Sequence, residues 1–241
     1  MLYLVCSVLF AQPLFDEEKL HAVQKELDPF RKLFIASTHP SIPKESYALA
    51  AQGEIATGVE PMPGFSSKIG WGVGIFHIDI DTMWATINNG EKHTGYTPVS
   101  YAKVVNNLPC QNHRITLMTL PIPILADRWW VVRSNTNPNL QKKSSGRVRE
   151  MSWKHIEDPE SVLNAELKAK IEGMIQIPLA LGAWTLFDIG DGYTLGEYHT
   201  WAQAGGSVPS GLTEIFVGKS VAKTMNAMKE LSKNEKVHCS F

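Results

Sequence analysis

The sequence predicts an α+β fold, in which a curved antiparallel sheet of about seven strands wraps around one long C-terminal helix. Two apolar, aromatic-rich runs at 175–187 and 193–202 are joined by the Gly- and Asp-rich segment 188–192, which is typical of a β-hairpin. An amphipathic helical pattern then extends to residue 231. Its apolar stripe consists of Leu212, Ile215, Phe216, Val221, Met225, Met228 and Leu231. Such a stripe must be buried, and the nearest apolar surface is the sheet, so we expect the sheet to grip the helix.

The chain begins with an apolar run over residues 1–11, which is about as long as a signal-peptide core. The run is too short to span a bilayer, and it lacks a basic start and a good cleavage site. We interpret 1–12 as a signal segment truncated at its front, which predicts export to the periplasm or out of the cell. The alternative is an apolar N-terminal segment that packs on the fold.

Residues 13–64 predict an N-terminal helix and an extension that precede the main domain. Apolar residues recur at helical spacing over 16–37, and acidic residues fill the first turn, where the helix dipole favours them. The following segment 39–64 is rich in Pro and Gly, and we expect a strand within 47–60. The main domain is therefore predicted to span residues 65–235.

The first strand of the main domain is predicted at 68–78, where Gly70, Gly72 and Gly74 share one face. Glycines in such a row let a helix or another backbone approach closely. A nucleotide-binding glycine loop is disfavoured, because the third spaced glycine before a helix is missing. A short helix is predicted over 82–88, and we interpret Asp81 as its N-cap rather than as a metal ligand.

Four more strands are predicted before the C-terminal hairpin, at 97–107, 113–121, 128–135 and 148–155. A charged, helical segment is expected at 158–169. Together with 68–78 and the two hairpin strands, these runs give the seven strands of a curved antiparallel sheet.

The order of the C-terminal motifs resembles the end of a START domain. More broadly, it is similar to the Bet v 1-like, polyketide-cyclase-like (SRPBCC) helix-grip superfamily. The matching positions are Gly182, Trp184, Leu186, Thr194, Tyr198, Gly206, Pro209 and Leu212, together with the Pro-rich run 121–126 that leads into Asp127-Arg128-Trp129-Trp130. The resemblance covers residues 65–235, and it implies a helix-grip fold.

Composition and motifs exclude several classes of function. The 241-residue chain is 44% hydrophobic and 20% charged with a net charge of −1, so nucleic acid is not an expected partner. The basic segment 141–149 is interpreted as a solvated loop rather than a headgroup contact. The three cysteines have no metal-type spacing, and whether Cys110 and Cys239 pair stays open. No cofactor or metal is expected.

Aromatic residues supply the candidate binding surface. Strand alternation places Arg128, Trp130 and Val132 on one face. If that face points inward, Arg128 is a buried cation that needs a carboxylate, which Asp127, Glu150 or Glu197 would supply. Such a pair would hold a polar headgroup, or it would be a structural salt bridge at a sheet edge.

The resemblance implies binding of a hydrophobic small molecule, such as a lipid or a sterol, between the sheet and the C-terminal helix, with transient membrane contact. The expected pocket residues are Trp84, Trp130, Trp184, Tyr198, Phe216 and Met225, with Arg128 and Glu197 as polar anchors. An enzyme is the less favoured alternative; it would be of the polyketide cyclase or aromatase kind and would use Arg128, His199 or Tyr198 as acid, base or oxyanion partner. A third alternative is a protein-interaction module with a filled core.

Overall fold

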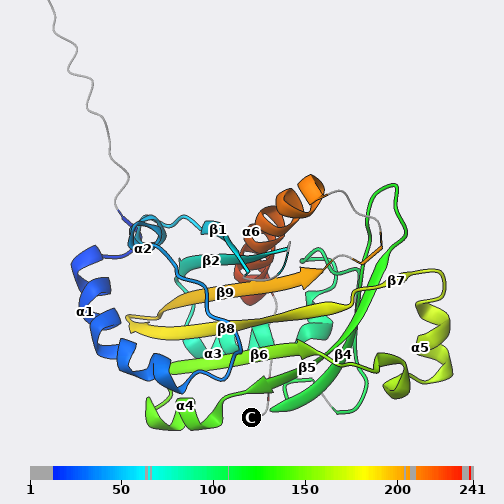
Figure 1. Cartoon of the computed structure of the whole chain (residues 1–241). Helices are drawn as coiled ribbons and strands as arrows, with labels where there is room; N and C mark the ends of the chain where they lie inside the picture. Colours follow the sequence, from blue (N-terminus) through cyan, green and yellow to red (C-terminus); the bar gives the residue numbers. More distant parts are fainter. Residues whose placement is uncertain are drawn as a thin grey trace, which may run out of the picture.

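The computed structural model describes residues 13–62, 65, 67–107, 109–203, 205–206, 210–234 and 239, except for the side chains of 210–218. The expectations for residues 1–12 and for Phe216 lie outside this description. One nine-stranded sheet dominates the fold (Figure 1). Its path is β1-β2-β9-β8-β6-β5-β4-β3, and β7 pairs with β5 off this path. All neighbours are antiparallel except β5 and β7, which are parallel.

The elements follow the predicted order. The strands are β1 (Ala56–Pro61), β2 (Lys68–Phe76), β3 (Tyr101–Val104), β4 (His113–Leu120), β5 (Arg128–Thr136), β6 (Val148–His155), β7 (Ile175–Gln176), β8 (Leu179–Gly190) and β9 (Tyr193–Gln203). The helices are α1 (Glu17–Leu27), α2 (Lys44–Ala51), α3 (Ile80–Asn88), α4 (Pro138–Lys143), α5 (Ala165–Lys170) and α6 (Ser210–Asn234). Three 3-10 turns complete them: η1 (Asp28–Leu33), η2 (Gly90–His93) and η3 (Pro159–Val162). The predicted α+β class is confirmed. β1 overlaps the strand expected within 47–60, whereas the short β7 was not predicted as a separate strand, and together they raise the count of the sheet from seven to nine strands.

Helix α6 packs on one face of the sheet, over β1, β2 and β9 (Figure 1). We call this the inner face. The close approach depends on Gly72, because a Cβ atom there would lie 2.5 Å from Met225 Sδ and 2.7 Å from Val221 Cγ1. The predicted role of the glycine row in β2 is thus confirmed at its contact with α6.

The N-terminal segment covers the opposite, outer face of the sheet (Figure 1). The predicted helix over 16–37 ends at Leu27, because Pro29 lies in the first turn of η1 and lacks the N–H that a continuous helix would use. Residues 28–43, which we call the strap, then cross β6, β8 and β9. Side chains of α1 and α2 share one core cluster with Val73, Phe187 and Leu195, so the N-terminal segment and the sheet form one folded unit.

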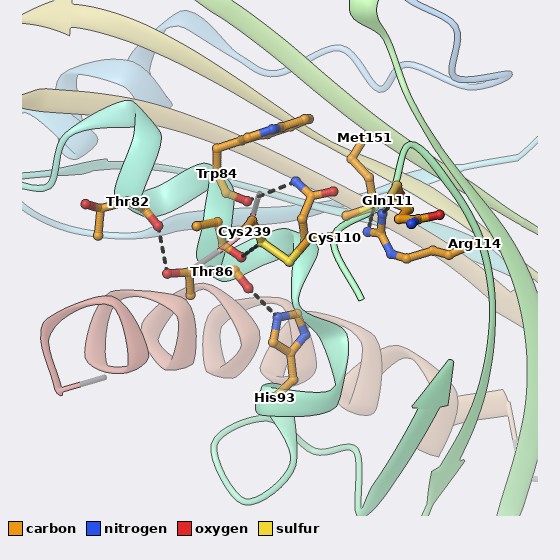
Figure 2. Close-up of a disulfide and its surroundings, with 11 residues drawn as sticks. Thr82, Trp84, Thr86, His93, Cys110, Gln111, Arg114, Met151 and Cys239 are labelled. Carbon is orange, nitrogen blue, oxygen red and sulfur yellow. Dashed lines mark hydrogen bonds between the residues drawn. A yellow bond between two sulfur atoms is a disulfide. The ribbon is translucent and has the colours of Figure 1, made fainter. Parts of the chain in front are cut away.

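Two local expectations are corrected or completed by the structure. Asp79, not Asp81, caps α3, and it accepts a hydrogen bond from Thr82 N at 2.9 Å. Asp81 instead forms an ion pair with Arg149 of β6. Cys110 and Cys239 form a disulfide that ties the chain after α6 to the loop before β4 (Figure 2).

Candidate ligand-binding site

The inner face of the sheet carries a group of partly exposed apolar side chains beside the buried core. These are Met118 of β4, Trp130 of β5, Trp153 of β6, and Tyr198 and Ala202 of β9. We call them the aromatic floor. The strand register places all of them on the face that α6 occupies, since Met118 pairs with Trp130, and Tyr198 pairs with Gly72. Partial exposure on a concave face beside a helix leaves apolar surface for a ligand to cover.

The rings of the floor are held by contacts along and across the strands. The Trp153 and Tyr198 rings are stacked with centroids 5.8 Å apart, and Tyr198 also lies 4.6 Å from the Trp184 ring. Trp153 lies over Gly182, where an added Cβ would be 2.4 Å from its Cζ2. The glycine therefore lets an indole lie flat against β8, which fixes the floor before any ligand arrives.

Polar groups are sparse on this face. Burial raises the pKa of the Tyr198 hydroxyl to about 12, so it is a neutral hydrogen-bonding group. His155 Nδ1 is buried and has no hydrogen-bond partner among the described residues. Burial, followed by the charge of Lys154, lowers the pKa of His155, which keeps the ring neutral near pH 7.

Arg128 lies at one end of the inner face, beside the β4–β5 loop (residues 121–127). It is 2% exposed, and it donates to Ala126 O and, at 3.4 Å, to Gly205 O. Arg128 therefore points inward, which is one of the two orientations that strand alternation left open. Its guanidinium bonds main-chain carbonyls from two segments that meet at this end of the sheet.

The predicted site residues divide between the two faces. Trp84, Trp184 and Met225 belong to the buried cluster between α3, α6 and the sheet, where they pack on one another. Trp130 and Tyr198 lie on the aromatic floor. The structure therefore brings five of the predicted residues to the inner face together with Arg128.

Glu197 lies on the outer face, away from the other predicted residues. Its Oε2 accepts a hydrogen bond from Arg31 Nη1 at 2.8 Å, and its Oε1 accepts one from Tyr47 at 2.8 Å. Glu150 also faces outward, and it accepts hydrogen bonds from the strap. Neither carboxylate is the counter-ion of Arg128, because both lie across the sheet from it.

His199 is likewise on the outer face. Its Nε2 lies 3.4 Å from Thr38 Oγ1, and burial together with the nearby His39 lowers its pKa to about 3. The set of Arg128, His199 and Tyr198 that a cyclase-like enzyme would use is thus split across the sheet. Among the described residues, no group of three or more His, Cys, Asp or Glu side chains gathers as metal ligands would.

Sequence reasoning missed Met118 and Trp153 as members of the site. Both are on predicted strands, but the face of a strand residue is known only when its register with the neighbouring strands is known. The structure also shows a cavity of about 400 Å³ on the outer face, between β5 and α5. It is lined by Trp129, Glu160, Lys168, Ala169, Ile171, Glu172 and Met174, so charged and apolar side chains share its wall.

Several solved structures share this architecture. A STAR-related lipid transfer protein fragment from Xanthomonas axonopodis has a TM-score of 0.62 at 18% identity, covering 75% of this chain and 94% of that chain. Human StAR-related lipid transfer protein 5 has a TM-score of 0.61 at 12% identity, covering 90% and 95%. The lipid transfer and protein localization domain of human StarD13 has a TM-score of 0.57 at 14% identity, covering 90% and 98%. No family model and no curated protein matches the sequence.

These likenesses show that the chain has the helix-grip fold of the START domains and the wider SRPBCC superfamily, as the order of its motifs predicts. At 12–18% identity they establish the fold and leave the ligand open. In the part of the chain that the structure describes, no helix has the length and apolar character needed to cross a membrane.

Proposed function

We propose that the protein binds a hydrophobic small molecule of the lipid or sterol class on the inner face of its sheet, beside α6. The observation that carries the proposal is the aromatic floor, whose apolar side chains stay partly exposed on the face that the fold otherwise buries. Burying large apolar side chains away from water lowers the free energy of the system, and a ligand on the floor would bury this surface. The shared fold with lipid transfer proteins is in keeping with this function.

The β4–β5 loop supports transient contact with a membrane. Ile124 at its tip is fully exposed, and Leu125 is also exposed. The loop lies at the end of the inner face marked by Arg128, whose guanidinium donates to Ala126 O of the same loop. Apolar side chains at this position would enter the interfacial region of a bilayer while the ligand passes to or from the floor.

Binding is tested first by native mass spectrometry of the protein purified from its own host, followed by organic extraction. A bound lipid of defined mass in stoichiometric amount is the expected result. The purified protein is then offered vesicles that contain phosphatidylcholine and cholesterol. An empty protein that also takes up neither lipid would refute the proposal.

A pair of variants locates the binding surface. Ala202→Phe adds a ring to the aromatic floor, and we expect it to reduce lipid uptake by about tenfold or more, because it fills the ligand's place. Ala169→Phe is the matched control in the outer-face cavity, and it is expected to leave uptake unchanged. If Ala169→Phe reduced uptake and Ala202→Phe did not, the binding site would lie on the outer face instead.

We also propose that the protein is exported. The apolar composition of residues 1–12 and the disulfide between Cys110 and Cys239 support this, because disulfides persist in oxidising compartments. Fractionation of the host cells tests it. Recovery of the whole pool from the cytosol, with both cysteines reduced, would contradict it.

A further inference from the structure

Arg114 is a buried cation on the inner face of β4, and its side chain is engaged by neutral groups (Figure 2). The residue is 3% exposed. Nη1 donates to Gln111 O at 2.9 Å, and Nη2 lies 3.3 Å from Met151 Sδ. Among the described residues, no carboxylate lies within ion-pair distance of this guanidinium. Within the described part of the chain, two of its five N–H groups have partners, and the other three can donate to another acceptor.

The described residues around Arg114 supply no negative charge. His93 of η2 is partly buried and donates from Nε2 to Thr86 O at 2.8 Å, and its pKa is lowered to about 4 by desolvation and then by the charge of Arg114. Burial lowers the pKa of Arg114 to about 10, so the guanidinium stays charged at neutral pH. Removing such a charge from water is costly unless an anion and hydrogen bonds compensate it.

A second buried polar atom on the inner side of the sheet, on α3, also has no partner among the described residues. Asn88 ends α3, and its Nδ2 donates to Trp84 O at 2.9 Å. Its Oδ1 is buried and accepts no hydrogen bond from any described residue. Buried polar atoms are normally satisfied, and the described residues leave both this oxygen and the Arg114 guanidinium without a full set of partners, a demand that a polar ligand group would meet.

The register connects Arg114 with the aromatic floor. Arg114 pairs with Ser134 of β5, and Ser134 pairs with Trp153 of the floor, so the three side chains form one row on the inner face. Arg128 lies six residues before Ser134 on the same strand, which corresponds to about 20 Å. The floor fills the distance between the two arginines. A cation therefore closes one end of an apolar surface whose other end meets the exposed β4–β5 loop.

We propose that Arg114 selects a ligand with an anionic head, a carboxylate or a phosphate, on a hydrocarbon chain. The head would take the free N–H groups of Arg114, and the chain would extend over Trp153 and Trp130 toward the β4–β5 loop. A span of about 20 Å suits a chain of roughly 16 carbons in extended form. This inference rests on the proposed function and adds the charge of the ligand to it.

The test compares three probes with the same 16-carbon chain: hexadecanoate, hexadecyl phosphate and hexadecanol. Binding is measured with the wild-type protein by native mass spectrometry and by the change in tryptophan fluorescence. We expect at least one anionic probe to bind about tenfold or more tightly than hexadecanol, since one charge-assisted hydrogen bond accounts for that ratio. The stronger of the two anions identifies the head as carboxylate or phosphate.

Two substitutions at Arg114 and one control complete the test. Arg114→Gln should abolish the preference for the anionic probe and leave hexadecanol binding in place, and Arg114→Lys should restore part of the preference. Arg133→Gln removes an exposed cation from the outer face of the neighbouring strand and should change nothing. A structural arginine would not alter the anion-to-alcohol ratio when it is replaced.

The outcomes separate the inference from the function on which it rests. A wild-type protein that binds hexadecanol as well as either anion overturns the role of Arg114 but keeps the proposed function. A wild-type protein that binds none of the three probes and takes up no lipid overturns both. If Arg114→Gln does not fold, the preference of the wild-type protein among the three probes still decides.

Discussion

Replacing Glu150 by Gln should loosen the strap from the sheet. Glu150 is fully buried on the outer face of β6. Its Oε1 accepts hydrogen bonds from Ile35 N at 3.0 Å and Ala36 N at 2.9 Å, and its Oε2 accepts from Ile35 N and from Asn137 Nδ2, both at 2.8 Å. Every one of these partners is a donor, so the site requires a group that only accepts.

The size of the effect follows from this arrangement. In Glu150→Gln one oxygen becomes an NH₂ group, and in either orientation of the amide that group faces at least one N–H donor. A hydrogen bond to a charged group contributes about 1.5–3 kcal/mol, and a buried donor left without an acceptor adds to the loss. We therefore expect the free energy of unfolding to fall by about 2–4 kcal/mol.

Two measurements check this prediction. Urea unfolding gives the free energy, and hydrogen exchange of residues 31–38 reports whether the strap opens. Glu230→Gln, an exposed substitution on α6, is the matched control and should change neither quantity. A loss below about 1 kcal/mol with unchanged exchange in the strap would show that the hydrogen bonds to Glu150 do not hold it.

Three further predictions concern the packing of α6, the disulfide and a buried histidine. Gly72→Ala should destabilise the fold by about 1–3 kcal/mol, because the new methyl group would overlap Met225 Sδ, and an unchanged melting temperature would contradict this contact. Opening the Cys110–Cys239 disulfide by reduction or by Cys110→Ser frees a loop of 129 residues. It should lower the free energy of unfolding by about 2–4 kcal/mol, and equal melting curves with and without reductant would argue against it. In the folded protein the pKa of His93 is lowered from 6.5 to about 4, so as the pH falls the unfolded chain binds the proton before the folded chain does. The contribution of neutral His93 to the free energy of unfolding is complete above pH 6.5, and it falls by about 1.4 kcal/mol per pH unit between pH 6.5 and pH 4. His93→Gln should flatten the measured slope over that range, and an identical slope would refute the buried, neutral state.

The predicted fold agreed with the structure where the residue pattern within one segment was sufficient to identify the element. Alternation and turn residues predicted the hairpin of β8 and β9, and the row of glycines in β2 predicted the approach of α6. The predicted helix over 16–37 was too long, because the apolar period continues through η1 although Pro29 interrupts the hydrogen bonding. The short strand β7 has only two residues, and such a strand is too brief to show a period.

The candidate site was predictable in kind and only partly in membership. Trp130 and Tyr198, which the sequence offered as candidates because aromatic residues on strands are conspicuous, lie together on the aromatic floor. Glu197 and Tyr198 are adjacent, and alternation alone says that they point to opposite faces, but it does not say which face meets α6. No sequence pattern marks Arg114, because its distance from the described carboxylates is a property of three-dimensional neighbours.

The sequence by itself determined the main strands, their order and the periodicity of the last helix, since each depends on a pattern within one segment. Only the tertiary structure decided which face is inner, which acids the strap contacts and which buried cation has no acid among the described residues. Arg31 and Glu197 are 166 residues apart, yet they form one ion pair across the outer face. The physical reason is that strand register and the folding of the strap onto the sheet bring together charges whose separation along the chain carries no information about their distance in space.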